Sequence, residues 1–202
     1  MIADVEIRDA GTKGRGVFSL RDFPMGAFIF RRRYGRIVGN RDIPSLPAVD
    51  RVHLCELDFD TSAILLPPGC YLNHSCEPNA MRSGVKVFAW QPIWAGEEIT
   101  IDYRLNSFGG DRWPCACGSP GCTGEVVGSF FSLDKDHQRL YLPFAPAFIQ
   151  CEYRRRLAPR SSPDRVDPHR SRRPVPGVAS GGGPGKVDTE RSDASNSCRG
   201  LS

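Results

Sequence analysis

Three cysteines just past the middle of the chain have a spacing that suits a metal ion. In "WPCACGSPGCTGE", Cys115, Cys117 and Cys122 form a C-x-C-x4-C pattern. Cysteines two residues apart are poor disulfide partners because the loop between them is so tight. Their thiolates are well placed to converge on one ion, and structural Zn²⁺ takes four ligands in a tetrahedron, with sulfur at about 2.3 Å. The pattern therefore predicts a structural zinc site with one ligand missing from the segment.

The fourth ligand has to come from another part of the chain. The candidates are Cys55, Cys70, Cys76, Cys151 and His74. Cys76 is favoured, because its binding would connect the cysteine segment to a second group of polar residues. Three free thiols in a loop are the alternative. A zinc ribbon that binds nucleic acid is a weaker alternative, since such a ribbon normally supplies two close cysteine pairs.

That second group lies in "YLNHSCEPNA", Tyr71 to Ala80, where Asn73, His74 and Cys76 fall within four residues. Pro78 and Asn79, both good turn formers, follow at once. An ordinary strand or helix has no need of three such groups so close together. The segment is therefore a candidate for binding or chemistry.

The elements that position these segments are expected to be short strands separated by glycine and proline turns. The expected strands are "DVEIR", "VFSL", "GAFIF", "YGRIV", "SAILL", "GVKVFAW" and "ITIDY". Breaks of this kind favour many small β elements over a regular β/α alternation. Residues 143–156, "PFAPAFIQCEYRRR", predict a terminal helix with Phe144, Phe148 and Cys151 on one side.

Composition limits the class of protein. The 202 residues carry a net charge of +4, and residues 157–202 hold eight Lys+Arg against five Asp+Glu. The rest is therefore nearly neutral and shows no strong polyanion-binding signal, so nucleic-acid binding is expected only weakly, through the tail. No apolar run approaches the roughly 20 residues needed to cross a membrane. We expect a soluble intracellular protein, cytoplasmic or nuclear. Eight cysteines could form four disulfides, but nothing indicates an oxidising compartment, and in a reducing cell clustered cysteines more often bind metal or do chemistry.

Taken together, the motifs resemble SET-domain protein-lysine methyltransferases. "NHSCEPN" is similar to the family signature, and four other segments follow the family order. These are "KGRGVF" for the glycine motif, "YGRIV" for the Y-x-G-E strand, "GEEITIDY" for the closing tyrosine motif and "CACGSPGC" for the post-SET zinc segment. Five motifs in fixed order over about residues 5–127 are far more specific than any one alone. One departure is Arg36, which stands where the Y-x-G-E pattern has its acid.

The resemblance implies a fold, a cofactor and roles for individual residues. The fold would be mainly β with short helices, made of small β-sheets around a pseudoknot, plus a zinc-bound post-SET segment. S-adenosylmethionine would be the methyl donor, and a structural Zn²⁺ would fix the post-SET segment. The implied cofactor contacts are Arg15, Gly16, Asn73 and His74. The implied catalytic residues are Tyr103 and Tyr34. The implied zinc ligands are Cys76, Cys115, Cys117 and Cys122.

The activity implied is methyl transfer to a lysine side chain of a protein, with a histone tail or another basic protein as the partner. The alternative from another class is a catalytically silent SET-like module that binds peptides. The domain boundaries expected are 1–112 for the SET domain and 113–128 for the post-SET zinc segment. A C-terminal extension, possibly helical, follows over 129–156. The Pro-, Gly-, Ser- and Arg-rich stretch 157–202 is expected to be disordered.

Overall fold

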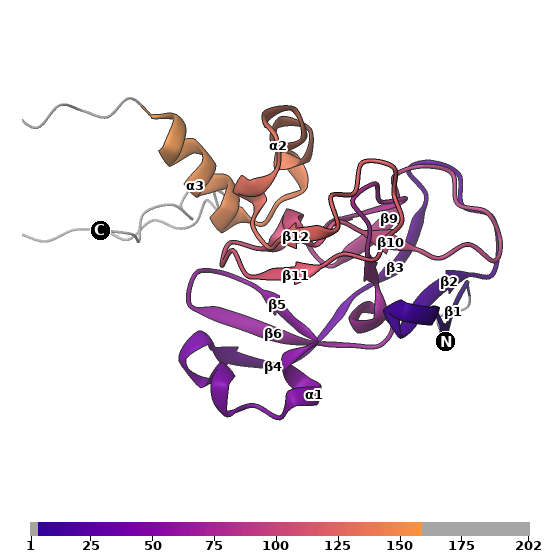
Figure 1. The fold of residues 1–202 in the computed structure, drawn as a ribbon, viewed down its shortest axis with the longest axis horizontal. Helices are drawn as coiled ribbons and strands as arrows, with labels where there is room; N and C mark the ends of the chain where they lie inside the picture. The colour runs from indigo at the N-terminus through magenta and orange to yellow at the C-terminus, as the bar shows by residue number, and fades with distance from the viewer. Residues whose placement is uncertain (1–3, 159–202) are drawn as a thin grey trace, which may run out of the picture.

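The computed structural model describes residues 4–158 (Figure 1). Within this range the chain forms five small sheets of two or three strands, and its longer helices come last. The expected fold class, mainly β with short helices, is confirmed. Most of the tail expected to be disordered, 157–202, lies outside the described residues. None of the helices described is both long and apolar enough to span a membrane.

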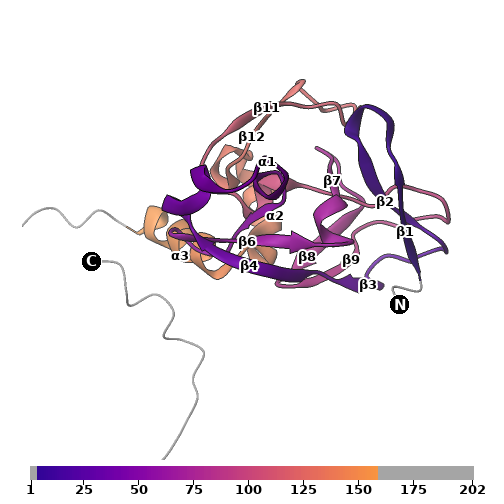
Figure 2. The same cartoon turned by 90° about the horizontal axis from the view of Figure 1, so that it is seen from below.

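The N-terminal hairpin joins β1 (Val5–Asp9) to β2 (Arg15–Ser19) in antiparallel register. The turn between them contains Gly11 and Gly14, both at positive φ, where a side chain would be strained. The hairpin lies at the opposite end of the molecule from the C-terminal helix α3 (Ala147–Leu157) in both views (Figures 1 and 2).

Two three-stranded sheets form the middle of the molecule. The first has the order β3-β9-β8, and the second has the order β4-β6-β5. Their bounds are Phe28–Arg31 for β3, Lys86–Ala89 for β9, Ala80–Ser83 for β8, Arg33–Gly39 for β4, Thr61–Leu66 for β6 and Leu54–Glu56 for β5. The segment between β4 and β5 contains a 3-10 helix, Asn40–Ser45, and a short α-helix, α1 (Ala48–Arg51).

Two smaller pairings carry the motifs. β7 (Asn73–His74) pairs in parallel with β10 (Thr100–Ile101). β11 (Arg112–Pro114) and β12 (Glu125–Val127) form an antiparallel hairpin. The loop of this hairpin is the cysteine-rich segment, so the hairpin fixes both ends of the expected metal site.

The C-terminal part contains α2 (Lys135–Tyr141) and α3. The Asp134 carboxylate caps α2 by accepting hydrogen bonds from the backbone N–H groups of Asp136 and His137. The expected terminal helix begins only after Pro146, which presets the first turn of α3. Phe144 belongs instead to a preceding 3-10 turn, Leu142–Phe144.

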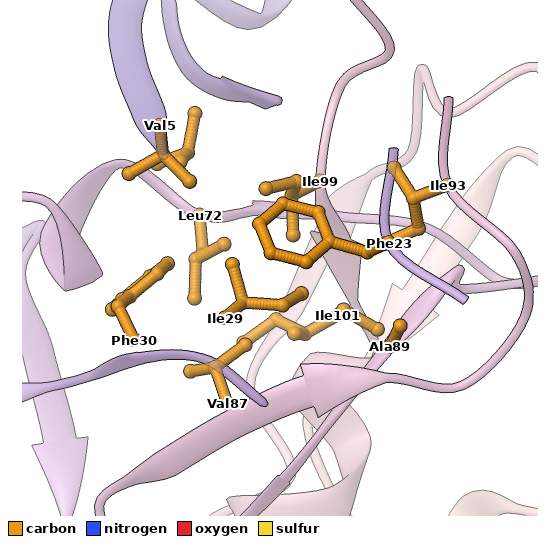
Figure 3. Packing of buried hydrophobic residues seen from close by; sticks show 12 residues of the cluster. Val5, Phe23, Ile29, Phe30, Leu72, Val87, Ala89, Ile93, Ile99 and Ile101 are labelled. Atoms are coloured by element: carbon orange, nitrogen blue, oxygen red, sulfur yellow. The ribbon is translucent and has the colours of Figure 1, made fainter. Parts of the chain in front are cut away.

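Two apolar clusters hold the sheets together. The first draws residues from β1, β2, β3, β8, β9 and β10 (Figure 3), and consists of Val5, Val17, Phe23, Ile29, Phe30, Leu72, Ala80, Val87, Ala89, Ile93, Ile99 and Ile101. The second consists of Met81, Leu105, Phe130, Leu133, Tyr141, Ala145, Phe148 and Ile149. Neighbours on β8 belong to different clusters because successive side chains on a strand point to opposite faces. β8 therefore joins the SET-like sheets to the C-terminal helices.

Candidate active site and metal centre

Two segments far apart in the sequence meet at the centre of the site. In the parallel β7–β10 pair, Asn73 lies opposite Thr100 and His74 lies opposite Ile101. The backbone N–H of Ser75 continues the pairing by donating to the carbonyl of Ile101 at 3.0 Å. The "NHSC" and "ITIDY" segments therefore lie side by side, as the expected pseudoknot requires.

Asn79 reinforces this short pairing from the side. Its Oδ1 accepts the backbone N–H of Thr100 at 2.9 Å, and its Nδ2 donates to the carbonyl of Glu98 at 2.8 Å. Its own carbonyl accepts the backbone N–H of Trp90 at 2.8 Å. Because strands of two residues make few ladder bonds, these side-chain bonds supply partners that the backbone groups would otherwise lack.

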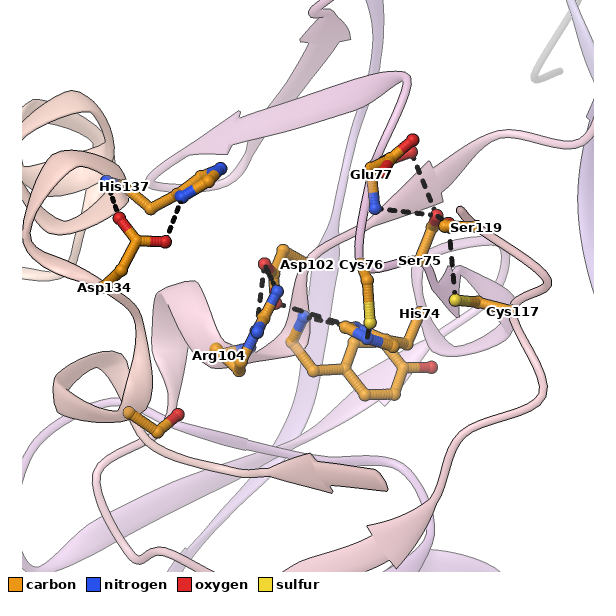
Figure 4. A network of polar contacts seen from close by, with 12 residues as sticks. His74, Ser75, Cys76, Glu77, Asp102, Arg104, Cys117, Ser119, Asp134 and His137 are labelled. Atoms are coloured by element: carbon orange, nitrogen blue, oxygen red, sulfur yellow. Dashed lines mark hydrogen bonds and ion pairs between the residues drawn. The ribbon is translucent and has the colours of Figure 1, made fainter. Parts of the chain in front are cut away.

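His74 connects the two motifs through both ring nitrogens (Figure 4). Nδ1 accepts the backbone N–H of Tyr103 at 3.1 Å, so the neutral ring carries its proton on Nε2. Nε2 lies 3.4 Å from Cys76 Sγ and donates toward it. Burial lowers the pKa of His74 to about 4, with Asp102 opposing this shift and Arg104 adding to it. The ring is therefore neutral at physiological pH and works as a structural link.

Tyr103 sits directly beside this histidine. Its hydroxyl donates to the carbonyl of Leu72 at 2.6 Å, and its ring lies 5.4 Å from the ring of His74 and 6.2 Å from that of Trp113. Burial, helped by the negative charge of Glu98, raises the pKa of Tyr103 to about 12. The phenol is thus held protonated in one orientation, with its oxygen lone pairs still free to accept.

Asn73 belongs to a polar cluster at the start of β2. Its Nδ2 donates to the carbonyl of Arg15 at 3.1 Å and to Glu98 Oε1 at 2.8 Å. Lys13 forms an ion pair with the other oxygen of Glu98. A Cβ at Gly16 would meet Glu98 Oε1 at 2.7 Å, so a larger residue there would displace the Glu98 carboxylate. Backbone carbonyl, amide and carboxylate groups are therefore gathered at one place.

The four expected metal ligands are brought together. The Sγ atoms of Cys76, Cys115, Cys117 and Cys122 all lie within 4.8 Å of one another, and the Cys76–Cys115 separation is 3.9 Å. A tetrahedron with Zn–S distances of 2.3 Å has edges of about 3.8 Å. The thiol set therefore fits a structural zinc ion and leaves no ligand position for water.

Polar bonds also hold the cysteine loop against the "NHSC" segment (Figure 4). Ser75 Oγ and Ser119 Oγ are 2.9 Å apart, and Glu77 Oε1 accepts the backbone N–H of Gly121 at 3.1 Å. Of the other proposed fourth ligands, Cys55 and Cys70 lie outside the thiol cluster and line a cavity instead.

That cavity has a volume of about 710 Å³ and is lined from several parts of the chain. Tyr103, Leu72 and Ile101 come from the paired segments, and Trp113 comes from the cysteine hairpin. Much of the remaining wall comes from β5 and the residues just before it, and Arg32 between β3 and β4 also lines it. Other lining residues come from β6, from residues 69–70 and from residues 106–111. Asn73, His74, Arg15 and Gly16 do not line it. Tyr103 thus stands between the cavity and the polar cluster around Asn73.

A profile of the SET domain family matches residues 14–104. This stretch of the chain is a SET domain. It contains the parallel pair, Tyr103 and the Asn73 cluster, and it ends before the cysteine hairpin. The resemblance to the SET domain seen in the sequence is confirmed, and the resemblance of residues 113–128 to a post-SET zinc segment stays a prediction.

Curated relatives share this SET domain. "Histone-lysine N-methyltransferase, H3 lysine-36 specific" of Eremothecium gossypii is 29% identical over 143 residues, which cover 62% of this chain and 21% of the relative. The protein of the same name from Candida albicans is 42% identical over 68 residues, which cover 30% of this chain and 8% of the relative. The chain thus matches about a fifth or less of the length of these relatives. Among solved structures, the methyltransferase domain of human histone-lysine N-methyltransferase SETMAR aligns with 25% identity and a TM-score of 0.48, covering 62% of this chain and 58% of that one.

The second tyrosine of the expected site lies elsewhere. Tyr34 does not line the cavity of the SET domain, and its hydroxyl accepts from Arg32 Nη2 at 3.4 Å. Arg32 does line the cavity. The role of Tyr34 in the lysine channel stays a prediction. In the structure, Arg32 lies between Tyr34 and the cavity beside Tyr103.

Sequence reasoning missed several residues of the site. Glu98 binds Asn73 and Lys13, Leu72 fixes Tyr103 through its carbonyl, and Trp113 lines the cavity. The only signal for Glu98 was its place between a turn and the buried strand residue Ile99. A backbone carbonyl such as that of Leu72 leaves no trace in the sequence at all.

Proposed function

We propose that the chain is a protein-lysine N-methyltransferase that takes its methyl group from S-adenosylmethionine. The observation that carries this proposal is the position of Tyr103. Its hydroxyl is fixed by Leu72 in the wall of a cavity, while its ring contacts His74 beside the Asn73 cluster. A group in the cavity and a ligand at the cluster would therefore meet at one phenol.

The Asn73 cluster fits the amino-acid end of S-adenosylmethionine. The Glu98 carboxylate and the Arg15 carbonyl are acceptors for an ammonium group, and the Asn73 amide lies between them. The remaining predicted contacts, Gly16 and His74, border the same cluster through β2 and β7. When bound, the cofactor supplies an electrophilic methyl group on a sulfonium.

The cavity residues would prepare the acceptor lysine. A free lysine amine has a pKa of about 10.4 and must lose its proton to attack. The apolar walls made by Leu72, Ile101 and Trp113 disfavour the ammonium by removing water from it. Tyr103, held by its bond to Leu72, presents its oxygen to the reacting group. Holding the amine in line contributes most, since oriented reactions gain about 7–11 kcal/mol.

The four-cysteine cluster would hold zinc in a structural role. Four thiolates complete its coordination, so neither Lewis-acid activation of water nor substrate binding at the ion is required. The ion would join Cys76 of the "NHSC" segment to the hairpin that carries Trp113. Domain limits of 1–112 for the SET domain and 113–128 for the zinc segment suit this arrangement, with 129–156 as a C-terminal extension.

The partner would be a protein with an exposed lysine. The relatives are named for histone H3 lysine 36, so a histone tail or another basic protein is the first substrate to test, in the nucleus or cytoplasm. Binding of nucleic acid would be weak and confined to the basic tail.

The test is transfer of a labelled methyl group from S-adenosylmethionine onto core histones and onto a proteome lysate, with mass spectrometry to identify the product. We expect labelled N-methyl-lysine in at least one protein. Cofactor binding is measured separately by calorimetry. No transfer combined with no cofactor binding would favour the silent peptide-binding module instead.

The pH dependence of the reaction is a further prediction. Because burial raises the pKa of Tyr103 to about 12, the phenol stays protonated over the whole working range. The acceptor lysine loses its proton as pH rises. We therefore expect kcat/KM to increase from about pH 7 to pH 10 without a falling limb below about pH 11. A bell-shaped profile that falls near pH 9 would contradict this assignment for Tyr103.

A further inference from the structure

Two arginines of the SET domain are buried without an acidic partner. Arg32 and Arg82 are each only 3% exposed. Arg82 lies close enough to Arg32 for the two positive charges to repel, and burial together with this repulsion lowers the pKa of Arg82 below the ordinary arginine value. Buried charges are normally paired, because an unpaired one loses its hydration without compensation.

The hydrogen bonds of this pair are few and weak. Arg32 Nη1 lies 3.6 Å from Cys55 Sγ, and Nη2 lies 3.4 Å from the Tyr34 hydroxyl and 3.2 Å from the carbonyl of Gly84. Arg32 Nε, Arg82 Nε and Arg82 Nη2 are buried with no hydrogen-bond partner. Over residues 4–158, neither guanidinium forms an ion pair with a carboxylate.

Arg32 faces the cavity that contains Tyr103. Both residues line it, together with Arg51 and His53, and the Nδ1 of His53 is also buried without a partner. Two acids line the same cavity, but Glu56 already accepts the backbone N–H of Phe108 at 2.8 Å, and Asp111 is exposed. Neither neutralises the arginine pair.

The cofactor does not account for the pair either. The residues proposed to hold it, Arg15, Gly16, Asn73 and His74, do not line this cavity. Arg32 is on the side where the proposed function places the acceptor lysine. An anion bound there would belong to the substrate.

We propose that Arg32, supported by Arg82, recognises a carboxylate side chain of the protein substrate, near in sequence to the lysine that is methylated. This inference rests on the proposed function. A carboxylate matches the planar guanidinium fork of Arg32 and would replace a thiol and a phenol, which are poor acceptors for a cation. The methylated lysine would then have an acidic residue near it in sequence. This requirement limits which lysines of a basic protein can be methylated.

The test uses the full chain and a positional peptide library with a fixed central lysine. At each flanking position glutamate is compared with glutamine, which has the same shape without the charge. We expect glutamate to raise kcat/KM by about tenfold or more at one position, as for a hydrogen-bonded ion pair. Equal rates for glutamate and glutamine at every position would overturn the proposal, and this result needs no variant.

The matched variants are Arg32→Met and Arg33→Met. Arg33 is the next residue, but it is exposed, and within residues 4–158 its side chain bonds only to the carbonyl of Pro67 at 3.3 Å. Arg32→Met should reduce the glutamate preference to less than about twofold, whereas Arg33→Met should keep it. A preference that survives in Arg32→Met would contradict the assignment. Arg32→Lys, which keeps the charge but not the fork, should give an intermediate preference.

Binding without cofactor separates this proposal from the proposed function. Fluorescence anisotropy of the labelled glutamate and glutamine peptides measures the carboxylate site alone. If no peptide is methylated but the glutamate peptide still binds more tightly in an Arg32-dependent way, the carboxylate site stands and the methyltransferase proposal fails. If methylation proceeds at a rate that depends neither on the glutamate nor on Arg32, the methyltransferase proposal stands and the carboxylate site fails.

Discussion

Tyr103→Phe is expected to reduce kcat for methyl transfer by about a hundredfold, the usual effect of removing one fixed polar contact to a transition state. The substitution deletes a hydroxyl that donates to the carbonyl of Leu72 and lines the cavity. The phenyl ring remains in contact with His74 and Trp113, so the cofactor cluster around Asn73 should be unchanged. Affinity for S-adenosylmethionine, measured by calorimetry, should therefore change little.

The fold must be checked in the same experiment. Loss of the hydroxyl leaves the buried Leu72 carbonyl without its partner, which costs about 1–3 kcal/mol of the free energy of unfolding. Circular dichroism and the melting temperature show whether the variant is folded at the assay temperature. Tyr153→Phe is the matched control, because Tyr153 packs against Phe130 in the C-terminal helices, away from the site. A Tyr103→Phe protein with wild-type kcat would rule out the catalytic role of this phenol.

The four-cysteine cluster shows what local spacing can predict. Cys115, Cys117 and Cys122 are held close by a short loop, so the pattern alone identifies them as a ligand set. Cys76 could be chosen only as one of five candidates, because its approach depends on a contact across 39 residues. Such a contact is decided by the whole fold and not by any local pattern.

The active site divides in the same way. The motif residues Asn73, His74 and Tyr103 are recognisable from their order in the chain, and the structure brings them together. Glu98 and Arg32 are not, because an acid that follows a turn and one arginine among three in "RRRY" look like solvent-exposed residues. What distinguishes Arg32 is burial beside Arg82, and burial of a polar residue follows from packing in three dimensions.

Among the helices, α2 lies in the extension 129–156 that the sequence predicts as possibly helical, but the pattern does not locate the helix within it. Lys135–Tyr141 contains only two apolar residues, so its seven residues give a weak periodic signal. The helix is stabilised by the Asp134 cap and by burial of Tyr141 and Gln138 against the second apolar cluster. Tertiary packing of this kind routinely outweighs the low propensity of a short isolated helix.

Loss of zinc from the four-cysteine cluster is expected to lower the rate of methyl transfer by about a hundredfold or more. Metal binding by thiolates contributes directly to folding free energy, and the ligands here join Cys76 to the 115–124 loop. Without the ion, the loop is held to the "NHSC" segment only by the Ser75–Ser119 and Glu77–Gly121 hydrogen bonds and by weak contacts among four thiols within 4.8 Å of one another. The hairpin that carries Trp113 would then lose one of its fixed ends, and the wall of the cavity beside Tyr103 would loosen.

Cys117→Ser and treatment with a strong chelator test this independently. Metal analysis should give one zinc per chain in the wild type and much less in Cys117→Ser, whereas Cys70→Ser, outside the cluster, should keep its zinc. Limited proteolysis should show new cleavage within 115–124 only when the metal is lost, because the paired strands β11 and β12 protect the flanks. Full activity after zinc removal verified by metal analysis would show that the cysteine hairpin does not shape the site. Cleavage in the loop together with lost activity, both restored by added zinc, would establish that the ion acts by fixing this wall.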